Sequence, residues 1–160
     1  MTTCITTLFI IIALYLFLIC PRIFDRPDIS PFLGIHYAHR GLFDNKSDAP
    51  ENSLPAFEKA CQKGYAIELD VQLSKDNIPV VFHDDNLKRM CGVDGSVWDY
   101  TIKELKKMRL AASDATIPTF EEVLQVVDGR VPLLIEYKLD HVQTTICQLT
   151  ESLLSGYNGL

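Results

Sequence analysis

Hydrophobic and polar residues alternate along residues 66–73, which read AIELDVQL. Side chains of a β-strand point alternately to opposite faces, so this segment predicts a strand with one aliphatic and one polar face. The polar face carries two carboxylates, Glu68 and Asp70. Such a face is ordinary where it meets water, but on a strand covered from both sides it would form part of a buried site.

Three other segments are short, mostly apolar and bounded by turn residues, as strands are. Segments with helical patterns lie between the strands, and this alternation is typical of βα units and a parallel sheet. We therefore predict an α/β fold in which four βα units are present. The predicted strands are residues 34–39, 66–73, 78–84 and 130–138.

Capping residues mark the predicted helices. Ser53 is suited to cap the N-terminus of a helix, and Gly64 is suited to end it. The tetrapeptides TIKE and TFEE match the capping box, so helices should begin after Thr101 and Thr119. The predicted helices are residues 54–63, the two that begin after Thr101 and Thr119, and residues 141–154. The helix after Thr119 should stop at Gly129, and the last helix should stop at Gly156. Residues 86–100 are expected to form a loop.

The N-terminal segment carries no charged side chain from Met1 to Cys20. A stretch of about 20 apolar residues is long enough to cross a bilayer core of about 30 Å, so we predict a transmembrane anchor over residues 1–20. A cleaved signal peptide is the alternative, but the segment lacks a basic start and a small-residue cleavage site. Single-pass membrane localisation is expected, and the side of the membrane stays open because only two arginines follow, Arg22 and Arg26.

The remaining chain is divided into a proline-containing linker over residues 21–33 and one domain over residues 34–160. The net charge of −6 and the lack of a basic patch exclude nucleic acid as a partner. An anionic substrate would therefore need a bound metal or a few placed cations. The 5 cysteines are irregularly spaced without a CxxC motif, which disfavours a disulfide framework or a zinc site.

Polar side chains recur at the carboxyl ends of the predicted strands, where parallel α/β folds build their sites. If they converge, three carboxylates lie close together, and each like-charged pair at about 4 Å costs on the order of 4 kcal/mol at an effective dielectric constant of 20. An all-oxygen cluster favours a hard divalent cation, Mg²⁺ or Ca²⁺. The residues in question are His39, Glu68, Asp70, His83, Glu136 and Lys138.

His39 and His83 would supply proton transfer at neutral pH. Two such groups suit the cleavage of a phosphodiester, while Arg40 and Lys138 would neutralise the phosphate oxygens. Less specific interpretations stay open for individual residues. The acidic strand face could be a wet surface, His83 could cap a turn, and Glu136 with Lys138 could be a structural ion pair.

These residues lie in sequence segments that resemble the glycerophosphodiester phosphodiesterase family. The matching segments, in the family's order over residues 36–140, are AHRG, APENSLPAFEKACQKG, IELDVQLSKDNIPVVFHDDNLKR, IPTFEEVL and LLIEYK. The resemblance implies a (β/α)₈ TIM barrel that hydrolyses glycerophosphodiesters to glycerol 3-phosphate and an alcohol. In the family the glycerol hydroxyl of the substrate attacks phosphorus, and water then opens the cyclic phosphate.

By matching position, the resemblance also assigns roles. His39 and His83 would be the catalytic acid–base pair, and a divalent cation would bind Glu68, Asp70 and Glu136. The predicted substrate-binding residues are Arg40, Glu51 and Lys138, with a supporting role for Glu51.

The chain is short for a closed barrel of roughly 200–250 residues, and a half barrel would expose two sheet edges. We expect a truncated member of the family; the alternatives are a homo-oligomer in which two chains complete a barrel, or a stub without activity. Two rival functions remain at this point: a lysophospholipid-type phosphodiesterase, which a membrane anchor would suit, and an inactive membrane-tethered fragment or binding module.

Overall fold

The structure is a computed structural model that describes residues 2–20, 26–138 and 145–159. It falls into two compact units, Met1–Leu33 and Gly34–Leu160. The first unit contains helix α1, Thr2–Ile19, and the 3₁₀ turn Ser30–Phe32. Residues 21–25 of the predicted linker and residues 141–144 of the predicted last helix lie outside the described residues.

The predicted membrane anchor over residues 1–20 is wrong. Within the described part of the chain, no helix combines the length and the apolar character that crossing a bilayer requires. The predicted single-pass membrane localisation is wrong for the same reason.

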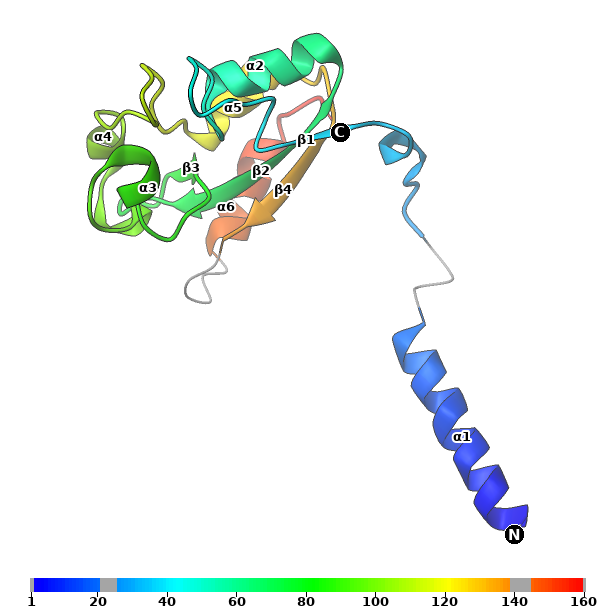
Figure 1. The fold of residues 1–160 in the computed structure, drawn as a ribbon. Coiled ribbons are helices and arrows are strands. Elements are labelled where there is room, and N and C mark those ends of the chain that lie inside the picture. Colours follow the sequence, from blue (N-terminus) through cyan, green and yellow to red (C-terminus); the bar gives the residue numbers. More distant parts are fainter. Residues whose placement is uncertain (1, 21–25, 139–144, 160) are drawn as a thin grey trace. The chain divides into compact units, whose positions relative to one another are not determined.

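The second unit is built around one central strand, β2, Ala66–Leu73 (Figure 1). Strand β1, Tyr37–His39, pairs with its first half in parallel, and strand β4, Leu133–Tyr137, pairs in parallel along residues 67–71. Strand β3, Pro79–Val81, is antiparallel to the second half of β2. The described sheet therefore holds three parallel strands and one antiparallel strand.

The antiparallel direction of β3 corrects the prediction that all four strands belong to parallel βα units. Only residues 74–78 connect β2 to β3, whereas a parallel crossover needs a dozen residues or more. These residues form a hairpin turn in which the backbone N–H groups of Asn77 and Ile78 donate to Ser74. Asn77 takes a φ of 60°, a left-handed conformation that asparagine tolerates.

Three helices cover one face of β2 (Figure 1). They are α2 (Leu54–Lys63), α5 (Phe120–Val127) and α6 (Thr145–Leu154). Each contributes buried apolar side chains to the core that contains every second residue of the strand, namely Ile67, Leu69, Val71 and Leu73. The alternation in the sequence thus separates the helix-covered face from a second face that carries Glu68, Asp70 and Gln72.

Helix boundaries follow the caps that the sequence shows. The Ser53 side chain accepts a hydrogen bond from the Ala56 N–H, and both capping boxes form, at Thr101 and Thr119. The first of these starts only a four-residue helix, α4 (Ile102–Leu105). Residues 86–100 are not all loop, because they contain α3 (Lys88–Cys91) and the 3₁₀ turn Val97–Asp99.

Gly41 follows β1 at a place where no larger residue fits. Its φ is +84°, and a Cβ would lie 2.9 Å from the Ala56 Cβ and 3.0 Å from the Phe57 ring. Gly64 provides a matched control, because its φ of +67° is also left-handed but no atom lies within 4 Å of the position that a Cβ would take there.

We expect Gly41→Ala to lower the free energy of unfolding by about 2–4 kcal/mol, since it adds a steric clash to the backbone strain. Gly64→Ala should cost only about 1–2 kcal/mol, because strain alone applies there. Urea unfolding followed by circular dichroism measures both values. Equal losses for the two variants would contradict the close packing of the β1–α2 turn.

Candidate functional site

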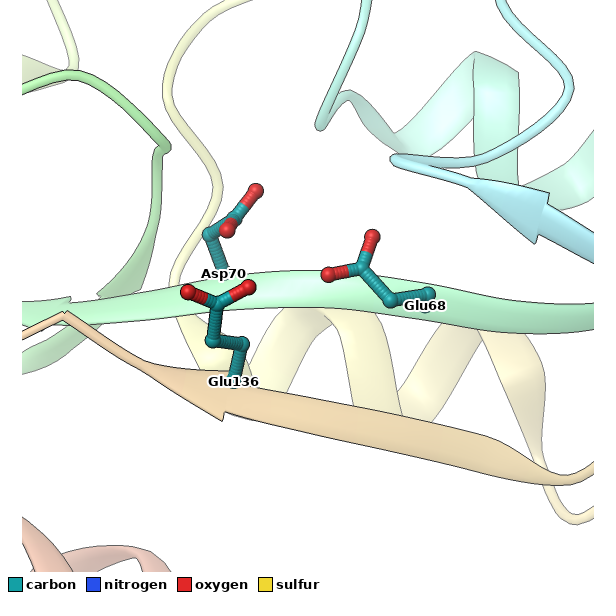
Figure 2. Close-up of side chains that lie close together, drawn as sticks. All are labelled: Glu68, Asp70 and Glu136. Atoms are coloured by element: carbon teal, nitrogen blue, oxygen red, sulfur yellow. The ribbon is translucent and has the colours of Figure 1, made fainter.

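Three carboxylates meet on the face of the sheet that the helices leave uncovered. Glu68 and Asp70 project from β2 and Glu136 projects from β4, all toward the same space (Figure 2). The parallel register places Asp70 directly opposite Glu136. One oxygen from each of the three carboxylates lies within 4.8 Å of the others. The burial differs, because Asp70 is 1% exposed whereas the Glu136 side chain is 53% exposed.

Asp70 is surrounded by groups that stabilise its negative charge. Asn52 donates a hydrogen bond to Oδ2 over 2.9 Å, Lys138 Nζ lies 3.1 Å from Oδ1, and Arg40 Nε lies 3.6 Å from Oδ2. Despite the ion pair with Lys138, the buried Oδ1 accepts no well-aligned hydrogen bond. Asp70 therefore retains acceptor capacity that points into the cluster.

Lys138 lies between two of the carboxylates, because its ammonium group also pairs with Glu136. Burial lowers the pKa of Lys138, but the attraction of the Glu136 and Asp70 carboxylates more than offsets it and leaves the pKa raised. The lysine is thus held as a cation inside the cluster. The predicted ion pair between Glu136 and Lys138 is present. Because Lys138 also pairs with Asp70, this ion pair is part of the carboxylate cluster.

Glu68 has a pKa that is raised by burial and, in second place, by the negative charge of Asp70. Its Oε2 accepts a hydrogen bond from the Arg40 backbone N–H over 3.2 Å and lies 3.9 Å from His39 Nε2. Because two of the three carboxylates are largely buried, the interpretation of β2 as a wet acidic surface is wrong. A bound cation would relieve the repulsion that raises this pKa.

The turn after β1 places His39 and Arg40 beside the cluster. His39 pairs with Glu68 in the parallel register, and its side chain is 66% exposed. Arg40 then takes a left-handed φ of 57°, and its carbonyl accepts a hydrogen bond from the Asn52 N–H. The Arg40 guanidinium thus lies beside Asp70, while the His39 side chain stays exposed.

Glu51 lies next to this turn, and protein donors occupy both of its carboxylate oxygens. Arg40 Nη1 donates over 2.9 Å, Asn45 Nδ2 over 2.8 Å, and Arg89 donates through two nitrogens. Burial raises the pKa of Glu51, but these hydrogen bonds outweigh it and hold the pKa at about 2. The carboxylate thus orients the two arginines that flank it.

His83 approaches from the segment that follows β3. Its Nδ1 lies 2.8 Å from Asp84 Oδ1, and Asp84 in turn accepts two hydrogen bonds from Arg89. An open depression of about 600 Å³ is bordered by His83, Asp84, Arg89 and Lys138, among others. His83 therefore borders the same open depression as the lysine of the carboxylate cluster.

Sequence reasoning overlooked three residues of this site, namely Asn52, Asp84 and Arg89. Asn52 could have been found, because asparagine after Glu51 in a polar loop is suited to the left-handed φ of 54° that it adopts. Asp84 could also have been found, because it directly follows His83 in the sequence. Arg89 ends a segment that matches the family, but this part of the chain was interpreted as a loop and no role was assigned to Arg89.

Comparison with known proteins places the chain among phosphodiesterases. Residues 39–154 match the family model described as the glycerophosphoryl diester phosphodiesterase family. A glycerophosphodiester phosphodiesterase of Bacillus altitudinis is 43% identical over 110 residues, which cover 64% of this chain and 44% of that protein. A putative glycerophosphodiester phosphodiesterase of Bacillus subtilis is 38% identical over 128 residues, covering 76% and 51%.

Solved structures give the same assignment. A phosphodiesterase of Oleispira antarctica in complex with the product sn-glycerol-3-phosphate is 32% identical, with a TM-score of 0.70 over 79% of this chain and 53% of that one. A glycerophosphodiester phosphodiesterase of Thermotoga maritima is 33% identical, with a TM-score of 0.64 over 79% and 52%.

The chain spans about half the length of the curated relatives that it matches. The matched segment nevertheless includes every residue of the site described above, from His39 to Lys138. Sequence, fold and site agree, and the chain belongs to the glycerophosphoryl diester phosphodiesterase family.

Proposed function

We propose that this chain carries the metal-binding and acid–base half of a hydrolase that converts glycerophosphodiesters to glycerol 3-phosphate and an alcohol. The observation that supports it most strongly is the cluster of Glu68, Asp70 and Glu136 with cationic side chains beside it, in a chain of this family. We infer that the three parallel strands form part of a (β/α)₈ barrel, as the resemblance implies.

The carboxylate cluster fits a hard divalent cation, Mg²⁺ or Ca²⁺. Its ligands are all oxygen, the buried Asp70 Oδ1 has free acceptor capacity, and burial with charge repulsion raises the pKa of Glu68. When bound, the cation would neutralise charge on the phosphate group. Glu68, Asp70 and Glu136 would hold it.

Arg40 and Lys138 would orient the phosphate group of the substrate. Both cations are fixed beside the cluster, Arg40 through Glu51 and Asp70, and Lys138 through Asp70 and Glu136. An anionic diester would otherwise be repelled by a chain with a net charge of −6. Fixed cations in a partly water-excluded site stabilise charge that builds on the phosphate oxygens during the reaction.

His39 and His83 would move the protons. As the attacking oxygen forms its bond to phosphorus, one imidazole accepts the proton of that hydroxyl. As the bond from phosphorus to the leaving oxygen breaks, the other imidazolium gives that oxygen a proton. In the route that the resemblance implies, the attacking hydroxyl belongs to the glycerol of the substrate, and water subsequently opens the cyclic phosphate.

A glycerol 3-phosphate product is supported by the Oleispira antarctica phosphodiesterase, whose structure holds that molecule. The lysophospholipid alternative was supported mainly by the predicted membrane anchor, and that prediction is wrong. An inactive binding module is the remaining rival, and a measurement of glycerol 3-phosphate release distinguishes it from the proposed hydrolase.

We expect the purified chain to release glycerol 3-phosphate from glycerophosphocholine when Mg²⁺ or Ca²⁺ is present. His39→Ala and His83→Ala should each lower kcat/KM by about 10²–10⁴-fold, because each removes one proton-transfer group. His36→Ala is the matched control, since this exposed histidine contacts the edge of the Tyr65 ring instead of facing the cluster. If neither metal supports release, or if His39→Ala equals wild type, the proposed activity is wrong.

We expect Asp70→Asn to weaken binding of Mg²⁺ or Ca²⁺ by at least about tenfold, because it removes the buried charge of the cluster. Isothermal titration calorimetry on the metal-stripped chain measures this without reference to activity. Asp48→Asn is the control, since this exposed carboxylate pairs only with Lys59 in the described contacts. Equal affinities for Asp70→Asn and wild type would exclude a cation at this cluster.

A further inference from the structure

Arg89 contacts two carboxylates at once, in the short helix α3 that follows the His83 segment. On one side, Nε and Nη2 donate to Asp84 over 2.6 and 2.8 Å. On the other side, Nη1 and Nη2 donate to Glu51 over 3.0 and 2.6 Å. The planar guanidinium fork is the only side-chain group that presents paired donors to two carboxylates in this way.

The Asp84 side of this arrangement acts on His83. An ionised carboxylate can only accept hydrogen bonds, so the 2.8 Å contact between Asp84 Oδ1 and His83 Nδ1 requires the proton to be on Nδ1. The neutral ring then has Nε2 free to accept a proton. Asp84, which is itself held by Arg89, thus sets both the tautomer and the orientation of the ring.

The Glu51 side connects His83 to the rest of the site. Glu51 is also bound by Arg40, and the Arg40 backbone N–H contacts Glu68. The chain of contacts therefore runs from Arg40, which directly follows His39, to the segment after β3 that carries His83. Arg89 is the link between them, although its side chain is 47% exposed.

A simple surface ion pair does not explain this geometry. Exposed pairs contribute little to stability, and an exposed arginine would gain little from one more carboxylate. Here the Glu51 side chain is only 6% exposed and holds two arginines, so its position is fixed by the surrounding structure. Because Glu51 is fixed, it also fixes the Arg89 guanidinium, which in turn holds Asp84.

We propose that Arg89 is a positioning residue: anchored on Glu51, it clamps Asp84 so that the His83 ring keeps its proton on Nδ1 and presents Nε2 to the substrate. The role as a catalytic aid rests on the proposed function, whereas the effect on the His83 ring does not. Arg89 itself contacts neither the carboxylate cluster nor His83 in the described hydrogen bonds.

The kinetic test compares Arg89→Gln and Arg89→Lys with Arg130→Gln, all in the full chain with Mg²⁺ or Ca²⁺. Arg130 is a matched control, because it also binds a carboxylate, Glu58, through two nitrogens. We expect both Arg89 variants to lower kcat for glycerophosphocholine by about 10²-fold with KM within about threefold of wild type. Lysine should fail because a single ammonium cannot reproduce the fork.

Chemical rescue adds a readout that a purely structural role would not give. Guanidinium at tens of millimolar should restore at least about tenfold of the kcat lost in Arg89→Ala and should leave His83→Ala unchanged. A rise in KM with unchanged kcat would overturn the proposal, since Arg89 would then bind substrate directly. Activity of Arg89→Lys equal to wild type would also overturn it.

An NMR measurement tests the same proposal without activity. In chain labelled with ¹⁵N-histidine, His83 should show the Nδ1–H tautomer in wild type and Arg130→Gln, and a mixture of tautomers in Arg89→Gln. If wild type proves inactive, the proposed function fails, yet these spectra still decide the role of Arg89. Where Arg89→Gln does not fold, Arg89→Lys takes its place; an unchanged His83 tautomer in the folded variant overturns the proposal.

Discussion

Burial of two carboxylates on the uncovered face of β2 is the constraint on which the rest of the site depends. The period of a strand places Glu68 and Asp70 opposite Ile67 and Leu69, whose face is packed under three helices. A buried carboxylate is tolerated only with compensating charge or hydrogen bonds. Once the core fixes β2, the surrounding chain must therefore supply cations and donors at this point, and Arg40, Asn52 and Lys138 do so.

The compensation extends outward as a sequence of alternating acidic and basic side chains. The order is Asp70, Arg40, Glu51, Arg89, Asp84 and His83. Each inner member is paired on both sides, so removing one leaves its neighbours with unpaired charge in a partly buried place. Such a network holds its members in one arrangement, and two of the segments it joins carry the histidines. The charge compensation of the carboxylate cluster and the placement of the two histidines are consequently linked.

Local patterns predicted the elements that local physics determines. Strand β2 and helix α2 have the predicted bounds, because alternation and the caps Ser53 and Gly64 act within a few residues. The direction of β3 was missed although its short connection to β2 excludes a parallel crossover. The role of Arg89 could not be predicted, since its partner Glu51 is 38 residues away in the sequence and only the folded chain brings the two together.

The precision of the cluster depends on a single ladder of hydrogen bonds. In the described part of the chain, β4 pairs with β2 alone, so Glu136 is placed opposite Asp70 only through that register. A shift by one residue would turn Glu136 to the helix-covered face, where Ile135 now packs against the core. The apolar packing of β4 thus protects the geometry of the carboxylate cluster, because a one-residue shift that turns Glu136 away also exposes Ile135. Core and site are specified by the same alternation.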